Sequence, residues 1–251
     1  GVDMLAIHTG DGTINALHDA AAGWDGNVLV LPGGTMNMLA RVLHGEATAT
    51  DILRAALIST AQPRRVTTVE PVDSDVAFCA LVGVFTGPTT AWGDVRETLR
   101  RRDIGGILAA VPNAIEQTFS GDHVEVAGHS GSYPSVYIEP VDGALRLLGF
   151  HAASAADLLS HGAAWLAGDF REGPNDLIGL MPEASICSAA SEIGLLVDGE
   201  RGRARTPLKL NGFINGKTVA ITRDNPADAL HFGKEVSLKI YDRHEIAAGQ
   251  S

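Results

Sequence analysis

The chain has 251 residues, of which 45% are hydrophobic, so it is long enough to bury one large core or two modest ones. Its formal net charge of −11 argues against a nucleic-acid-binding or polybasic membrane-binding protein, because both need an excess of Lys and Arg. No apolar run approaches the ~20 residues that a membrane-spanning helix requires. The two cysteines, Cys79 and Cys187, lie in apolar strand-like contexts without metal-binding spacing, so we expect buried, reduced thiols and a cytoplasmic protein.

The first predicted element is a strand over Val2 to Ile7, which leads into the turn Gly10-Asp11-Gly12. Glycine permits a turn that a Cβ would obstruct, and we expect Asp11 at the apex of this turn. Apolar residues at helical spacing then predict a helix from Ile14 to Ala22, which ends before Gly23. The N–H groups at the start of such a helix have no partners within it and suit phosphate oxygens.

The same order of elements follows a second time. An apolar strand over Asn27 to Leu31 leads into the glycine turn Pro32-Gly33-Gly34-Thr35, and a helix over Met38 to His44 comes next, with Asn37 as its predicted cap. Consecutive parallel strands bring such turns to one edge of a sheet, where ligands bind. A single Gly-Asp-Gly segment usually marks an ordinary turn, whereas two glycine turns in tandem favour a nucleotide site.

The remaining chain changes character after a predicted helix over Thr50 to Ser59. We predict a first, α/β domain at 1–62 and a second, β-sandwich-like domain at 63–251 with helical insertions. The insertions are expected at Thr89–Arg102, Ile104–Gln117 and Ala155–Ala167. The strands are expected at Val66–Val69, Val76–Phe85, His123–Val126, Ser135–Glu139, Ala144–Phe150, Ser185–Ala189 and Ile193–Val197, with two or three more after Asn211, including a hairpin that turns at Asn215-Gly216.

Four segments carry a family resemblance. They are Thr9-Gly10-Asp11-Gly12-Thr13-Ile14-Asn15, Pro32-Gly33-Gly34-Thr35-Met36-Asn37 with Ala40-Arg41, Asp142-Gly143-Ala144-Leu145, and Val197-Asp198-Gly199-Glu200. They resemble, in order and spacing, the GGDGTxN, PxGTxN…AR, DGxL and DGE segments of the diacylglycerol kinase and sphingosine kinase-like lipid kinases, over roughly residues 1–210. The GFL-containing loop expected of the related NAD kinases is absent from the sequence. The resemblance implies an NAD kinase/diacylglycerol kinase-like nucleotide domain followed by a β-rich lipid-substrate domain.

The resemblance also implies which residues bind the nucleotide, ATP with Mg²⁺. These are Thr9, Gly10, Asp11, Gly12, Thr13, Asn15, Pro32, Gly33, Gly34, Thr35 and Asn37. Asp11 would hold a ribose hydroxyl or a metal-bound water, and its alternative role is to close its own loop as an Asx turn. Helix capping would by itself explain Thr13, Thr35 and Asn37. The metal ligands are not indicated.

Three acids are the catalytic candidates. The resemblance to the DGE turn implies that Glu200 is the general base that accepts the proton of a lipid hydroxyl, with Asp198 in a supporting role. The spacing of Asp198-Gly199-Glu200 would by itself suit an ordinary hairpin turn. Asp94 lies where the family carries an acid of its interdomain network, and an exposed helical carboxylate is the alternative.

The resemblance therefore implies a bacterial-type, ATP-dependent lipid kinase of phospholipid metabolism. It would phosphorylate diacylglycerol, phosphatidylglycerol or a sphingoid lipid during transient, peripheral contact with the cytoplasmic face of the membrane; a homodimer is left open. Two departures from the family are present: Thr9 replaces the first glycine of the leading motif, and the strand-loop-helix segment with an NPxSG-like loop that precedes it in the family is missing, so we expect an N-terminally truncated chain. The alternatives are a non-catalytic nucleotide- or lipid-binding relative and a kinase of a soluble acceptor such as NAD.

Overall fold

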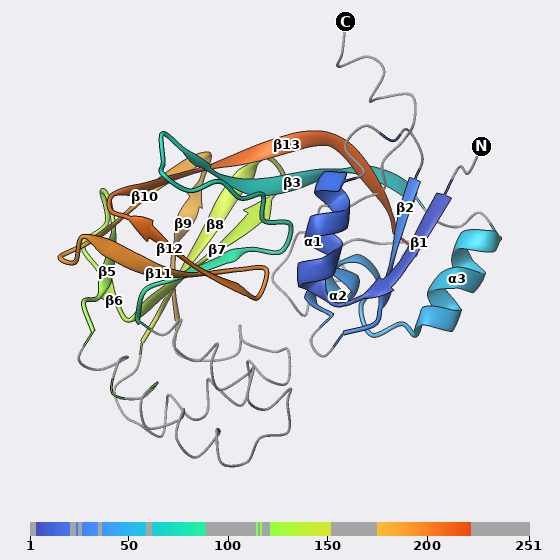
Figure 1. Cartoon of the computed structure of the whole chain (residues 1–251), viewed down its shortest axis with the longest axis horizontal. Coiled ribbons are helices and arrows are strands. Elements are labelled where there is room, and N and C mark those ends of the chain that lie inside the picture. The colour runs from blue at the N-terminus through green and yellow to red at the C-terminus, as the bar shows by residue number, and fades with distance from the viewer. Residues whose placement is uncertain are drawn as a thin grey trace, which may run out of the picture. The chain divides into compact units, whose positions relative to one another are not determined.

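Figure 1 shows the computed structural model, which describes residues 4–20, 24, 27–34, 37–58, 62–88, 114, 116, 121–151 and 175–221. Contacts within the chain divide it into two compact units. The first comprises Gly1–Thr68, Val141–Gly143 and Phe213–Ser251, and the second comprises Val69–Pro140 and Ala144–Gly212. Three segments of the predicted second domain, 63–68, 141–143 and 213–251, thus belong to the first unit. The rest of that predicted domain forms the second unit.

The first unit is built on two parallel strands. β1 (Met4–Thr9) pairs with β2 (Asn27–Pro32) from Met4↔Asn27 to Thr9↔Pro32, so the segments that follow the two strands lie at the same edge. The predicted alternation of strands and helices is confirmed. The helices are α1 (Asp11–Ala20), α2 (Met38–His44) and α3 (Ala49–Leu57).

Apolar side chains of β2 form the centre of the first unit's core. Leu29 and Val30 are each only 1% exposed, and β2 contacts both α2 and α3. These two helices bury Leu43 and Ile52 completely. Burial of such side chains stabilises the unit by about 1.5–3 kcal/mol each, which fixes the strand ends that carry the glycine turns.

The second unit is β-rich, as predicted. One sheet has the order β12-β11-β4-β7-β8-β9, and another set of strands joins β13, β10, β5 and β6 in that order. The strands of the first sheet are β12 (Glu200–Arg205), β11 (Glu192–Val197), β4 (Val84–Thr86), β7 (Ser135–Val141), β8 (Ala144–Phe150) and β9 (Asn175–Met181). The others are β5 (Val124–Val126), β6 (Ser132–Tyr133), β10 (Glu183–Ser188) and β13 (Leu208–Ile221).

Side chains from both groups of strands fill one core in the second unit. Val126, Ile186 and Leu208 come from one group and pack in the same buried cluster as Leu147 and Leu195 from the other. β5 and the start of β10 bury alternate residues, which is the pattern of a sheet that is covered on one face, whereas β7 is buried along almost its whole length. The two cysteines are free thiols, and both are half-buried rather than fully buried as expected.

Two of the predicted β elements are wrong. The segment Val76–Phe85 is extended as a strand only from Val84, and Ala80 makes an isolated bridge to Val69. The hairpin at Asn215-Gly216 is absent, because β13 continues unbroken to Ile221. β13 pairs near its start with β10 and through Val219 with Val28 of β2, and its partner β3 (Gln62–Val72) runs beside it (Figure 1). Pairing with β10, β2 and β3 stabilises an extended backbone in β13 in place of the predicted turn at Asn215-Gly216.

Other predictions differ in extent. β6, β9 and β12 were not predicted, whereas β8 has the predicted bounds. The predicted helices Thr89–Arg102 and Ala155–Ala167 lie outside the described residues. Of Ile104–Gln117, only Ala114 and Glu116 are described, and both are helical.

Candidate functional site

The first glycine turn is shorter than predicted, because α1 begins directly at Asp11. The carbonyl oxygen of Gly10 accepts hydrogen bonds from the N–H groups of Thr13 and Ile14, both at 3.1 Å. Gly10 is thus the residue before the helix, and Asp11 and Gly12 form its first turn. The prediction that Asp11 stands at the apex of a loop, with the helix starting at Ile14, is wrong.

The carboxylate of Asp11 is buried, and it binds the start of a different helix. Its Oδ2 accepts from the N–H of Met38 at 3.0 Å, and its Oδ1 accepts from the N–H of Leu39 at 2.9 Å. The whole residue is only 6% exposed. Because these two N–H groups belong to the first turn of α2, Asp11 supplies the cap that the sequence assigned to Asn37.

Asn37 occupies the N-cap position of α2, as predicted, but its side chain does not cap the helix. Its backbone is left-handed, with φ 51° and ψ 42°, and its side chain makes no capping hydrogen bond to α2. The side-chain Oδ1 instead accepts a hydrogen bond from the N–H of Gly34. Asn tolerates this backbone conformation better than most residues, so Asn37 closes the second glycine turn on itself.

The two glycine turns pack backbone against backbone. A Cβ added to Gly34 would lie 2.5 Å from the Cα of Gly10, and a Cβ added to Gly33 would lie 2.5 Å from the backbone nitrogen of Thr9. Both distances are far shorter than a van der Waals contact. Glycine is therefore required here by close approach of the two segments.

The other predicted nucleotide residues lie around this contact. Thr9 ends β1 opposite Pro32, Thr13 is exposed in the first turn of α1, and Asn15 is half-buried in the next turn. Thr35 lies outside the described residues. The first unit thus brings together all the described residues that the sequence assigned to the nucleotide.

The segment Asp198-Gly199 is a two-residue hairpin turn between β11 and β12, with positive φ values of 46° and 91°. The carboxylate of Asp198, 4% exposed as a residue, accepts from the N–H groups of Leu81, Val82 and Gly83 at 2.7, 2.9 and 2.9 Å. The N–H of Asp198 donates to the carbonyl of Gly83 at 3.0 Å. Asp198 thus anchors the turn to the segment before β4 and explains why Val76–Phe85 is not one strand.

Glu200 directly follows this anchored turn. It is the first residue of β12, pairs with Val197 and is exposed. Asp198 and Glu200 therefore differ in environment. The Asp198 carboxylate accepts hydrogen bonds from backbone N–H groups, whereas the Glu200 carboxylate is accessible to solvent. The third catalytic candidate, Asp94, lies outside the described residues.

The other Asp-Gly segment in the family resemblance, Asp142-Gly143, is also a two-residue hairpin turn. Its φ values are 42° and 80°, and it joins β7 to β8. The N–H of Gly143 donates to the Oγ1 of Thr67 at 2.9 Å. The described contacts thus give this motif a structural role within the first unit.

A polar cluster in the second unit was missed by the sequence reasoning. The buried Tyr133 hydroxyl lies 2.9 Å from Nε2 of His129 and donates to Oδ2 of Asp176 at 3.2 Å, and the same oxygen lies 2.8 Å from Nε2 of His151. The hydrogen bond from His151 lowers the pKa of Asp176, and burial, followed by the bond to Asp176, raises the pKa of Tyr133. The four residues share no motif spacing, so no sequence signal could have found them.

Residues 1–70 match the diacylglycerol kinase catalytic domain, and this region contains both glycine turns and Asp11. The resemblance to the diacylglycerol kinase family is thereby confirmed for residues 1–70. No curated protein gives a significant match.

Solved structures show the same fold. A diacylglycerol kinase from Bacillus anthracis str. Sterne is similar at a TM-score of 0.53 and 16% sequence identity, over 84% of this chain and 75% of that one. A structure of a candidate diacylglycerol kinase from the same organism gives a TM-score of 0.52 at 15% identity, over 84% of this chain and 74% of that one. At such identities the likeness shows the fold alone.

Glu200 and Asp198 lie beyond the part that matches the diacylglycerol kinase catalytic domain, so their roles rest on the DGE resemblance and on the geometry of the turn. Within the described ranges, no group of three His, Cys, Asp or Glu residues is placed to hold a metal ion. The carboxylates of Asp11 and Asp198 accept hydrogen bonds from two and three backbone N–H groups, respectively. None of the described helices is long and apolar enough to cross a membrane.

Proposed function

We propose that the chain is an ATP-dependent lipid kinase, which transfers the γ-phosphate of ATP to the hydroxyl group of a lipid. One observation carries the proposal: the region that matches the diacylglycerol kinase catalytic domain folds into two glycine turns at one edge of parallel strands. Turns of this kind bring backbone N–H groups close to phosphate oxygens. The fold is also similar to that of a diacylglycerol kinase, which is compatible with this proposal.

The first unit would hold the nucleotide. α1 is ten residues long and starts immediately after β1, so the partial positive charge at its N-terminus lies at the sheet edge. Gly10 and Gly12 carry no side chains that would keep a phosphate away from the backbone there. In phosphoryl transfer the protein mainly positions the two substrates and neutralises charge, which a backbone cradle can do.

Glu200 would act on the lipid acceptor. Its exposed carboxylate can accept the proton of a hydroxyl group, whereas that of Asp198 is filled by three N–H groups. Asp198 then has a positioning role, because it fixes the turn from which Glu200 extends. Mg²⁺ stays a prediction from the family, and the described residues contain no group of three His, Cys, Asp or Glu residues placed to hold it.

Replacement of the proposed base tests this function. Glu200→Gln keeps the shape of the side chain and removes the base, so turnover should fall by about 10²- to 10⁴-fold. The assay is transfer of label from γ-labelled ATP to vesicles that contain diacylglycerol and phosphatidylglycerol.

Glu192→Gln provides a matched control, because Glu192 is an exposed glutamate on the paired strand β11, where it forms a surface ion pair with Arg203. This variant should turn over like the parent. Turnover of Glu200→Gln within threefold of the parent would contradict the assignment of Glu200.

A further inference from the structure

We propose that Asp11 is a positioning residue that holds the second glycine turn closed against the first, rather than a proton acceptor or a metal ligand. This inference rests on the proposed function, because its consequence is measured on ATP binding. It assigns Asp11 a role different from the ribose or metal-water contact that the family resemblance implies.

The first step in the argument concerns the hydrogen-bond donors of the second turn. The N–H groups of Met38 and Leu39 are taken by the two carboxylate oxygens of Asp11, and the N–H of Gly34 is taken by the side chain of Asn37. Three donors that could face a phosphate are thus satisfied within the protein. In the described part of this region, these donors therefore have partners within the protein.

The second step concerns charge. The carboxylate of Asp11 lies at the positive end of α2 and compensates for it. A phosphate at the same place would have to displace a buried carboxylate or lie next to it, and both are unfavourable. The phosphates are therefore excluded from the start of α2.

The third step concerns the contact between the turns. Asp11 is the first residue after Gly10, and Gly10 is the residue against which Gly34 packs without room for a Cβ. The same short segment thus contacts the second turn through its backbone and through the Asp11 side chain. Loss of the side chain would leave two buried N–H groups of α2 without acceptors and would loosen this contact.

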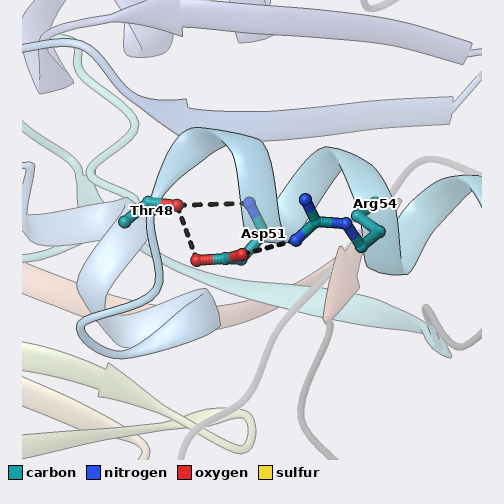
Figure 2. A network of polar contacts seen from close by, with 3 residues as sticks. All are labelled: Thr48, Asp51 and Arg54. Atoms are coloured by element: carbon teal, nitrogen blue, oxygen red, sulfur yellow. Dashed lines mark hydrogen bonds and ion pairs between the residues drawn. The ribbon is translucent and has the colours of Figure 1, made fainter.

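Three variants test the inference. Asp11→Ala removes both acceptor oxygens, and Asp11→Asn retains one. The control is Thr48→Ala, which removes the cap of α3 in the same unit. There the Oγ1 of Thr48 accepts from the N–H of Asp51 at 3.2 Å, and the Asp51 carboxylate in turn pairs with Arg54 (Figure 2). The control thus matches the loss of a helix cap without touching the glycine turns.

The primary measurement is the affinity for ATP by calorimetry, at a temperature where all variants are folded. Asp11→Ala should bind ATP about five- to tenfold more weakly, as expected for loss of a helix cap that supports the binding conformation, and Thr48→Ala should bind like the parent. Asp11→Asn should recover part of the affinity, and its kcat at saturating ATP should lie between that of Asp11→Ala and that of the parent. A proton acceptor would behave differently, because its Asn variant would lose kcat as completely as its Ala variant.

Hydrogen exchange of the Met38 and Leu39 amides gives a readout that does not need nucleotide. Both amides should exchange faster in Asp11→Ala than in the parent or in Thr48→Ala. If the parent binds ATP and Asp11→Ala binds it equally well, the inference fails while the proposed function stands. If the parent itself binds no ATP, the proposed function fails and the inference falls with it, whatever the amides show.

Discussion

Two aspartates that the sequence marks as functional, Asp11 and Asp198, both use their carboxylates on backbone N–H groups of a distant segment. Asp11 binds residues 27 and 28 positions further along the chain, and Asp198 binds residues 115 to 117 positions earlier. The sequence identified these residues as important but could not show their partners. Pairing across such separations depends on the fold and leaves no local pattern, whereas the turn conformation of Asp198-Gly199 follows from the dipeptide itself.

The His129–Tyr133–Asp176–His151 cluster gives a prediction at the scale of one residue. The hydrogen bond and charge of His151 lower the pKa of Asp176, so His151→Ala should raise that pKa toward the ordinary aspartate value. A lowered pKa in the folded state stabilises the protein above the unfolded-state pKa, and this contribution is lost as the pH falls through the folded-state value. The difference in stability between parent and variant should therefore vanish at acid pH.

NMR titration of the Asp176 carboxyl group, together with urea unfolding at several pH values, measures this effect. His123→Ala is a suitable control, because His123 is also exposed and its side chain has no part in the cluster. An Asp176 titration midpoint that is the same in the parent and in His151→Ala would refute the assigned cause.

At the scale of elements, the sequence pattern predicted helices and strands correctly where neighbouring residues supply the hydrogen-bond partners. The strand–turn–helix repeats of the first unit and the strand Ala144–Phe150 were predicted on this basis. The Asn215-Gly216 hairpin was wrong because β13 pairs with β10 and β2, which lie far apart in the sequence. The cap of α2 was assigned to Asn37 because sequence rules consider only neighbouring residues.

The contact between the glycine turns gives a prediction at the same scale. Gly34→Val places a branched side chain where even a Cβ would lie 2.5 Å from the Cα of Gly10, so the two turns must separate. We expect ATP affinity to fall at least about tenfold, because separation of the turns would displace the first turn, whose backbone N–H groups are proposed to contact the phosphates. Calorimetry with ATP and Mg²⁺ measures the effect.

Gly202→Ala is the control for this prediction, since an added Cβ there would make only an ordinary contact of 3.8 Å with Leu195. It should leave ATP binding unchanged. Equal ATP affinity in Gly34→Val and the parent would remove the second turn from the nucleotide site.

At the scale of the whole molecule, the order of an α/β part and a β-rich part followed from the change in sequence pattern. The pairing of β13 with β2 could not be predicted from the sequence pattern, because Val219 and its partner Val28 are separated by most of the chain. The identity of the acceptor lipid also cannot be predicted from the sequence, because a lipid-binding surface is apolar and has no characteristic residue spacing. The claim that the chain phosphorylates a lipid therefore needs a direct chemical test.

The most direct test is an acceptor screen with the full chain and γ-labelled ATP. Vesicles containing diacylglycerol, phosphatidylglycerol or sphingosine are compared with soluble NAD, and the lipid and aqueous phases are counted separately after extraction. We predict label in the lipid phase with at least one of the vesicles, and loss of that label in Glu200→Gln. Label in NAD alone, or no transfer of label to any lipid, would contradict the account.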